Sequence, residues 1–395
     1  MIKNLLTKAL LFFIAILLLM VAYSFGYHQG ELQIPLPPED LPREADITLL
    51  WDVWNRLEEK YAGEIDYQQM IYGAAEGMTK GLQDPYTVFF SPEDSKVFKQ
   101  EIAGSFEGVG MEIGIRDGDL TVIAPLENTP AKKAGLLPGD KIVRIDETST
   151  RDMSTDQAVK LIRGKKGTSV VLSVLRKGWD KAKDFTIVRD TINIPSVRWE
   201  LIEGDIAHII IYQFSGKLDN DFSKIAREIK NTQAKKIVLD VRNNPGGLLH
   251  EAQKLAGWFI EKGKIVTIEQ FSEGEVREYK AMGNEMFLNY PAVVLINQGT
   301  ASGAEILAAA LRENRTDVKI IGEKSFGKGS VQEPVDLRGG SLLKVTIAHW
   351  LTPEGNLIEG HGLEPDIEIK MTEEDYLEGK DPQLDKAVEI LRKGL

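Results

Sequence analysis

Ser302 and Lys328 are residue types that can act together as nucleophile and base, and each lies in a glycine-containing segment. The apolar run that begins at Val293 leads through a glycine turn to Ser302 and then into an alanine-rich stretch, which predicts a strand, a turn and a helix. At a helix N-terminus, free N–H groups and the positive end of the dipole stabilise a developing oxyanion. However, Ser302 and Glu305 also match a helix capping box, and this segment by itself favours capping over catalysis.

Lys328 lies between two glycines in the segment Gly322-Glu-Lys-Ser-Phe-Gly-Lys-Gly-Ser-Val-Gln. The segment nearly matches the phosphate loop G-x-x-x-x-G-K-[ST], but Gly329 replaces the hydroxyl residue, and the following residues are extended rather than helical. An NTP-binding loop is therefore excluded. As a strand, the segment would place Lys328, Ser330 and Gln332 on one face. A lone lysine is nevertheless explained more simply as a solvated surface charge.

A third segment carries an apolar strand, Lys236–Val241, into a turn that ends in Gly246 and Gly247. Two consecutive glycines let a backbone approach a ligand closely and direct N–H groups at it, although a turn without a ligand has the same pattern. Together, the three segments supply a nucleophile, a base and an oxyanion donor. No histidine has a sequence context that marks it as the base, yet sequence distance does not exclude one, so a Ser/His hydrolase stays open.

The amino-acid composition excludes several other classes of protein and of site. The chain has 395 residues, 43% of them hydrophobic, which is enough for two or three globular domains and excludes a wholly disordered chain. Its formal net charge of −12 argues against a nucleic-acid partner. The absence of cysteine excludes disulfides, thiolate zinc sites and a cysteine nucleophile, and the low number of histidines, 5, argues against a His-rich metal site. We expect no cofactor.

The N-terminus predicts export from the cytoplasm. Residues 9–27 are almost wholly apolar and follow Lys3 and Lys8. Nineteen helical residues span roughly 28 Å, close to the thickness of the bilayer hydrocarbon. We interpret them as an uncleaved signal anchor, and a signal peptide cleaved after Ser24 is the alternative. The expected location is the bacterial cell envelope, on the outer face of the inner membrane or in the periplasm.

Periodicity divides the rest of the chain into modules. The predicted fold class is a multi-domain α+β protein with a mainly α/β core, because strands and helices alternate after about residue 181. The predicted order is a signal segment (1–27), a proline-rich spacer (28–44), a helical domain (45–103), a compact β-rich module (104–180), the α/β core (181–372) and a C-terminal helix (373–395).

These motifs, in this order, resemble the carboxyl-terminal processing (tail-specific) peptidases. The resemblance rests on Arg242-Asn-Asn-Pro-Gly-Gly, Ser302-Gly-Ala-Glu and Phe326-Gly-Lys-Gly-Ser-Val-Gln, together with Asp84-Pro-Tyr-Thr, Gly108-Val-Gly and Gly362-Leu-Glu-Pro-Asp. It implies a serine endopeptidase with an inserted PDZ domain and a core related to crotonase and ClpP-like folds. One departure is Gly303, where an alanine is more usual.

The resemblance also implies roles for individual residues. Ser302 would be the nucleophile, Lys328 the general base and Gln332 the residue that orients the lysine, with Gly246, Gly247 and Gly303 forming the oxyanion hole. The PDZ domain would bind the free C-terminus of a protein or peptide substrate through Gly108, Val109, Gly110, Met111 and Ile113. A non-catalytic PDZ scaffold of the cell envelope is the alternative, acyl-CoA chemistry is a distant third, and association of identical chains is left open.

A lysine base imposes a physical condition. Free lysine has a pKa near 10.4 and is charged at neutral pH, so it must be buried to accept a proton from serine. We therefore expect Lys328 to be buried and to accept a hydrogen bond from Ser302.

Overall fold

The computed structural model describes residues 46–116, 118–126, 128–193, 195–272 and 274–394. The chain divides into two units, residues 1–70 and 71–395. The predicted membrane segment (9–27) and the spacer (28–44) lie outside the described residues. Within the described ranges, no helix has both the length and the apolar character needed to cross a bilayer.

The first unit holds helix α2 (Thr48–Lys60) and the start of α3 (Tyr67–Lys80). Helices are present at the start of the region predicted as a helical domain (45–103), but none of the α2 residues is buried. The rings of Trp54 and Tyr67 stack with centroids 5.4 Å apart. The apolar side chains Leu49, Leu50 and Val53 of α2 are exposed.

The β-rich module is a sheet in the order β3-β4-β5-β7-β8, with β6 paired to β5. Its core is closed by apolar side chains from the sheet and from α6, such as Val122, Leu172 and Ala158. Helix α6 begins with a capping box between Ser154 and Gln157, so this boundary is set by local sequence. The elements are β3 (Met111–Arg116), β4 (Asp119–Pro125), α5 (Pro130–Lys133), β5 (Lys141–Ile145), β6 (Thr148–Ser149), α6 (Thr155–Ile162), β7 (Ser169–Leu175) and β8 (Lys183–Val188). The chain enters and leaves this module along a two-stranded ribbon of β2 (Ser105–Gly108) and β9 (Asp190–Asn193).

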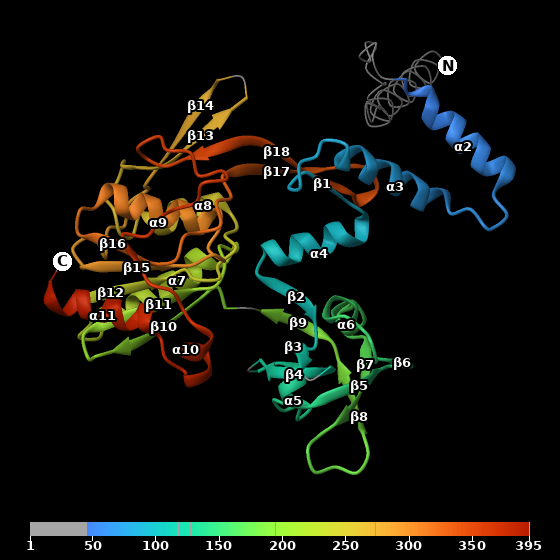
Figure 1. The fold of residues 1–395 in the computed structure, drawn as a ribbon, viewed down its shortest axis with the longest axis horizontal. Coiled ribbons are helices and arrows are strands. Elements are labelled where there is room, and N and C mark those ends of the chain that lie inside the picture. The colour runs from blue at the N-terminus through green and yellow to red at the C-terminus, as the bar shows by residue number, and fades with distance from the viewer. Residues whose placement is uncertain (1–45, 117, 127, 194, 273, 395) are drawn as a thin grey trace, which may run out of the picture. The chain divides into compact units, whose positions relative to one another are not determined.

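The α/β core is built on a sheet in the order β10-β11-β12-β15-β16-β19, parallel except for β10 (Figure 1). Alternate residues of its strands face opposite sides: Leu239 packs with α7, α8 and α9, whereas Val238 packs with α11. The sheet is therefore the middle of three layers. Its elements are β10 (Val197–Ile202), β11 (Ile206–Ile211), α7 (Leu218–Lys230), β12 (Lys236–Asp240), α8 (Leu249–Ala256), β15 (Ala292–Ile296), α9 (Gly303–Asn314), β16 (Val318–Gly322), β19 (Ile367–Glu368) and α11 (Pro382–Lys393), with α10 (Glu373–Glu378) before α11.

A second sheet runs in the order β1-β18-β13-β14, and β17 also pairs with β18. Its strands are β1 (Val88–Phe90), β13 (Ile265–Phe271), β14 (Val276–Lys280), β17 (Ser330–Asp336) and β18 (Leu342–Leu351), with the 3₁₀ turn η1 (Arg338–Gly340) between β17 and β18 and helix α4 (Pro92–Ile102) after β1. The β17–β18 ladder has an irregularity between Val331 and Gln332, where Val331 pairs with Ala348 but Gln332 pairs with Thr346. Strand β18 therefore carries an extra residue, Ile347, at this point.

Buried core elements follow the sequence prediction closely. Apolar periodicity predicts strands at 141–145 and 292–296 and helices at 218–230 and 382–393, and these are the bounds of β5, β15, α7 and α11. Ser91 caps α4 by accepting a hydrogen bond from the Asp94 N–H. Strands β8, β9, β10, β13 and β14 were not predicted. Charged residues interrupt the apolar pattern of β8, β9, β10 and β14 because these strands have an exposed face, as in β14, where only Tyr279 is half-buried. In β13 the charged residue, Glu269, is itself buried.

Truncating Leu239 tests whether the central sheet forms the core of the α/β domain. It is fully buried in β12, so Leu239→Ala should lower the free energy of unfolding of the core by about 3 kcal/mol, from lost burial and a residual cavity. Leu201→Ala, on the half-exposed edge strand β10, is the matched control and should cost less than about 1 kcal/mol. Thermal unfolding would measure both, and equal shifts would contradict this assignment of the core.

Candidate active site

The glycine turn and Ser302 meet because β12 and β15 are neighbouring parallel strands, whose carboxyl ends lie at one edge of the sheet. Hydrogen bonds join the two segments directly. The Thr300 hydroxyl donates to the Val241 carbonyl at 2.8 Å, and the Ala301 N–H donates to the Asn244 carbonyl at 2.9 Å. The tertiary fold thus brings together two segments about 55 residues apart in the sequence.

Ser302 stands at the start of α9 with a backbone that side chains rarely adopt, φ 53° and ψ −120°. A non-glycine residue at positive φ costs on the order of 1–3 kcal/mol and persists only where its surroundings hold it. Ser302 is half-buried, and the next helical residues, from Gly303 to Leu311, are all buried. The strained turn therefore presents the Ser302 side chain at the partly open end of a rigid helix.

Gly246 and Gly247 are glycines because their backbone lies against other backbone. A Cβ on Gly246 would come within 2.6 Å of the Ala301 carbonyl oxygen, and one on Gly247 within 2.4 Å of the Phe214 carbonyl oxygen. The Gly246 N–H donates to the Asn244 Oδ1 at 2.8 Å, so it is already used, contrary to the predicted oxyanion role.

Two predicted oxyanion donors remain available. In the described part of the chain, no hydrogen bond occupies the N–H of Gly247 or of Gly303. A Cβ built on Gly303 would lie 3.6 Å from the Gly247 nitrogen, so the backbones of the two glycines are neighbours. That distance is an ordinary van der Waals contact, so position 303 has room for an alanine, and sterics do not require glycine there.

Glu305 joins the serine segment to the lysine segment. Its buried carboxylate accepts hydrogen bonds from the N–H groups of Ser302 (2.8 Å), Gly327 (2.7 Å) and Lys328 (3.0 Å), and from the Ser325 hydroxyl (2.5 Å). Burial raises the pKa of Glu305 despite these donors. Sequence reasoning identified Glu305 only as a capping residue, whereas three of its four partners belong to the segment from Ser325 to Lys328.

Lys328 lies just before β17, not within it, so the period-two argument does not extend to it. A Cβ on Gly329 would lie 2.2 Å from the Glu359 nitrogen, and one on Gly327 2.8 Å from the Gly362 nitrogen. The chain around Lys328 is therefore pressed against residues 359–362, which explains the two flanking glycines.

The side chain of Lys328 is half-buried, and burial followed by the positive charge of Lys344 lowers its pKa, although Glu359, Asp84 and Glu305 act against the shift. Its Nζ lies 4.9 Å from the centroid of the Tyr86 ring. Among the described residues, Nζ forms no hydrogen bond with Ser302 or Gln332. The expected Ser302–Lys328 hydrogen bond is thus absent from this arrangement, because the ammonium is held over the aromatic face instead.

The turn Asp84–Thr87, which sequence analysis used only for the resemblance, is fastened to β18. Asp84 accepts hydrogen bonds from the hydroxyls of Thr87 and Thr346, each at 2.6 Å, and from the Tyr86 N–H at 2.9 Å. The Thr346 N–H donates in turn to the Thr87 hydroxyl at 3.0 Å. These bonds hold Tyr86 over Lys328. They also connect the turn to Gln332, whose Nε2 lies 3.4 Å from the Thr346 Oγ1.

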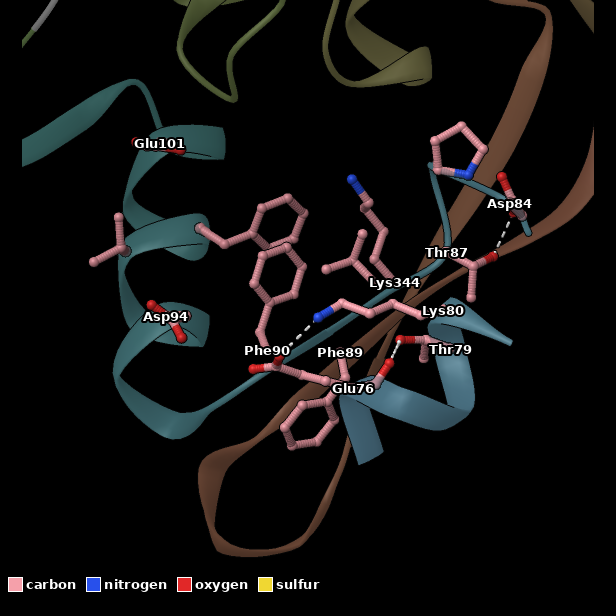
Figure 2. A pocket seen from close by; sticks show the side chains of 14 residues that line it. Glu76, Thr79, Lys80, Asp84, Thr87, Phe89, Phe90, Asp94, Glu101 and Lys344 are labelled. Atoms are coloured by element: carbon pink, nitrogen blue, oxygen red, sulfur yellow. Dashed lines mark hydrogen bonds and ion pairs between the residues drawn. The ribbon is translucent and has the colours of Figure 1, made fainter. Parts of the chain in front are cut away.

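A groove of about 780 Å³ lies beside this turn and is lined by Asp84, Thr87 and Lys344 together with aromatic residues of β1 and α4 (Figure 2). The Lys344 ammonium lies 5.9 Å from the Phe90 ring centroid and 5.8 Å from that of Phe98. Burial lowers the pKa of Lys344. Neither Ser302 nor Lys328 lines the groove, which meets the candidate site through Asp84 and Lys344.

Histidine does not take the place of the lysine. His208 contacts Glu200 and Asp240, each at 3.2 Å, and His250 lies 3.2 Å from Glu251. No hydrogen bond joins Ser302 to any histidine in the part of the chain that the structure describes. In that part, no cluster of His, Asp and Glu side chains is arranged to hold a metal ion.

The β-rich module has a groove of about 220 Å³ between β3 and α6. Four of the five predicted peptide-binding residues line it: Val109, Gly110, Met111 and Ile113. The fifth, Gly108, instead ends β2, where it pairs with Asp190. Sequence analysis missed the opposite wall, which includes Val159, Ile162 and Arg163. The Arg163 guanidinium lies over the Phe106 ring and is paired with Glu101 at 3.0 Å.

Comparison with known proteins agrees with this architecture. Family models match the chain as an activating protease CtpB N-terminal domain (residues 39–94), a PDZ domain (121–176) and peptidase family S41 (205–369). Two relatives from Bacillus subtilis (strain 168) are the carboxy-terminal processing proteases CtpA and CtpB. CtpA is 37% identical over 84% of this chain and 70% of its own length, and CtpB is 34% identical over 89% and 73%. A solved structure of a photosystem II D1 C-terminal processing protease matches with a TM-score of 0.51 and 30% identity, over 80% of this chain and 86% of that one.

A peptidase core that carries a PDZ domain is the class of protein defined by these matches. The chain belongs to the carboxy-terminal processing proteases of peptidase family S41. The resemblance drawn from the sequence is confirmed, and so is the mixed α/β fold with a PDZ domain. The relation to crotonase and ClpP-like folds and the domain boundaries stay predictions.

Glu305 tests whether the two segments depend on one carboxylate. Glu305→Gln puts an NH₂ group where four donors converge, so kcat/KM for peptide cleavage should fall at least about tenfold, and the melting temperature should also fall. Glu269→Gln is the matched control, because Glu269 is a buried glutamate on β13 that accepts a hydrogen bond from Tyr279. Equal activity of the two variants would contradict a bridging role for Glu305.

Proposed function

We propose that the protein is a serine endopeptidase that cleaves exported proteins near their C-terminus, with Ser302 as the nucleophile and Lys328 as the general base. The observation that carries the proposal is the Glu305 carboxylate, which binds the backbone of both residues at once. Because both backbones share one buried anchor, the distance between the Ser302 and Lys328 side chains depends mainly on side-chain rotation.

The chemistry requires an uncharged amine. Neutral Lys328 takes the proton of the Ser302 hydroxyl as Oγ attacks the scissile carbonyl carbon, and the ammonium then protonates the leaving amine. Water attacks the acyl-serine in the second half of the reaction, the same amine takes the proton from water, and the ammonium returns it to the Ser302 Oγ as the acyl–oxygen bond breaks. Burial and the charge of Lys344 favour the neutral amine, in the direction that this mechanism needs.

The arrangement over Tyr86 is a resting position of the base. The Lys328 backbone is held by Glu305, but its side chain has four rotatable bonds, so side-chain rotation is the motion that would carry Nζ from Tyr86 towards Ser302. Two buried oxygens, Ser330 Oγ and Glu359 Oε2, have no hydrogen-bond partner among the described residues. An unpaired buried oxygen costs about 1–3 kcal/mol, which favours a second arrangement in which they are satisfied.

The oxyanion hole is assigned to the N–H groups of Gly247 and Gly303, which lie together and carry no other hydrogen bond among the described residues. Each donor of this kind contributes on the order of 3 kcal/mol to the transition state of acyl transfer. The Gly246 N–H supports them indirectly, because its bond to Asn244 holds the turn.

Substrate choice is assigned to the groove of the PDZ domain. Its walls are mostly apolar, from Met111 and Ile113 on β3 to Val159 and Ile162 on α6, which suits an apolar C-terminal residue. An extended tail would add a strand beside β3, and N–H groups near Gly110 would hold the terminal carboxylate. The apolar residues 9–27 support a place at the outer face of the bacterial inner membrane, where exported proteins would be the substrates.

Removal of either reacting group tests the mechanism. Ser302→Ala and Lys328→Ala should both abolish cleavage of a quenched fluorescent peptide with a free, apolar C-terminus, with unchanged circular dichroism.

In the wild type, the rate should rise with pH and then level off, because the neutral fraction of Lys328 grows as pH passes its lowered pKa.

Removing the charge of Lys344 tests the direction in which the pKa of Lys328 shifts. Lys344→Met removes a positive charge beside Lys328, so the pKa of Lys328 should rise and the ascending limb of the pH–rate profile should move to higher pH. Lys319→Met, on the exposed side of β16, should leave the profile unchanged. A wild-type profile that is flat between about pH 6 and pH 10 would rule out a lysine base.

Amidation of the substrate tests tail recognition. A peptide with an amidated C-terminus should have a KM at least about tenfold higher than the same peptide with a free carboxylate, because a charge-assisted hydrogen bond is lost. Met111→Glu, which places a negative charge in the groove, should raise the KM of the free-acid peptide and leave kcat at saturation little changed. Equal turnover of amidated and free peptides would exclude carboxylate capture.

A further inference from the structure

The side chains that surround Gln332 form a chain of hydrogen bonds with a definite direction. Asp84 is at the end of this chain, and hydrogen bonds from Thr346 and Thr87 outweigh the effect of burial and lower the pKa of its carboxyl group. An ionised carboxylate only accepts hydrogen bonds. The hydroxyl of Thr346 therefore gives its single proton to the Asp84 Oδ2, at 2.6 Å.

The direction of this bond decides whether the Thr346 hydroxyl acts as a donor or an acceptor towards Gln332. Once its proton is committed to Asp84, the Thr346 oxygen has only lone pairs left for other neighbours. The Thr87 hydroxyl does not change the direction of these hydrogen bonds, because it too donates to the Asp84 Oδ2 at 2.6 Å and accepts from the Thr346 N–H. The Gln332 side chain must then turn its NH₂ group towards Thr346. This orientation follows because the Thr346 oxygen has no proton left to donate, and it does not depend on how the amide oxygen and nitrogen of Gln332 are assigned.

The bulge in β18 creates this contact. In a regular antiparallel ladder, the pairing of Val331 with Ala348 would place Gln332 opposite Ile347. The extra residue in β18 places Gln332 opposite Thr346 instead, so the amide meets a hydroxyl rather than an apolar side chain. Bulges next to active sites commonly re-aim a side chain in this way.

We propose that Thr346, oriented by Asp84, is a positioning residue that fixes the Gln332 amide with its carbonyl oxygen available to Lys328. This inference rests on the proposed lysine base. A neutral lysine amine has two N–H donors and one lone pair. If the Gln332 Oε1 accepts one N–H, the lone pair is free to accept the proton of Ser302. In the reversed orientation, the NH₂ group of Gln332 competes with Ser302 for that lone pair.

The experiment compares two threonines of the same sheet in the full-length enzyme. Thr346→Val removes the orienting hydroxyl with little change of shape, so kcat for the fluorescent peptide should fall about tenfold while KM stays within about twofold. Thr346→Ser keeps the hydroxyl and should restore kcat. Thr267→Val is the matched control, because Thr267 is a buried threonine of β13 whose hydroxyl donates to the Leu351 carbonyl of β18.

The control separates orientation from stability. Thr346→Val loses two hydrogen bonds and Thr267→Val loses one, so the melting temperature should fall for both variants, but Thr267→Val should keep its kcat. If Thr346→Val keeps wild-type kcat, or if Thr346→Ser loses as much as Thr346→Val, the inference is overturned. If Ser302→Ala or Lys328→Ala still cleaves the peptide, the proposed function itself fails, which is a different outcome of the same assay.

Discussion

The candidate site depends on one buried carboxylate. Glu305 accepts four hydrogen bonds, and its donors come both from the start of α9 and from the segment that carries Lys328. A carboxylate with fewer partners would be costly at this depth, because desolvation already raises its pKa. The two chain segments are thus held to each other by the same bonds that make the buried charge tolerable.

A balance of charge and burial acts on the lysine. Burial and Lys344 disfavour the ammonium, whereas Glu359, Asp84 and Glu305 favour it, and the net effect is a lowered pKa. The Tyr86 ring gives the charged form a resting place. The turn Asp84–Thr87 takes part in both effects, since it carries Tyr86 and is fastened through Thr346 to the strand that faces Gln332.

Sequence reasoning was accurate where a signal is local. The helix start at Ser302, the glycine turn at Gly246 and the bounds of α7 and β15 each follow from periodicity, capping or a positive φ over a few residues. It was less accurate for exposed strands such as β14, whose apolar pattern is interrupted by charges. It also assigned a free donor to Gly246, because residue type does not reveal that the Asn244 side chain takes up that N–H.

The amino-acid sequence by itself determined the order of the modules, the family and the two residues assigned to the chemistry, because these depend on motifs and on short-range pattern. Tertiary structure decided which atoms meet. The contact of Tyr86 with Lys328, the link from Asp84 to Thr346 and the pairing of Gln332 with Thr346 join positions 14 to 262 residues apart. Such contacts arise from strand pairing and from one extra residue in β18, and no local preference of either partner encodes them.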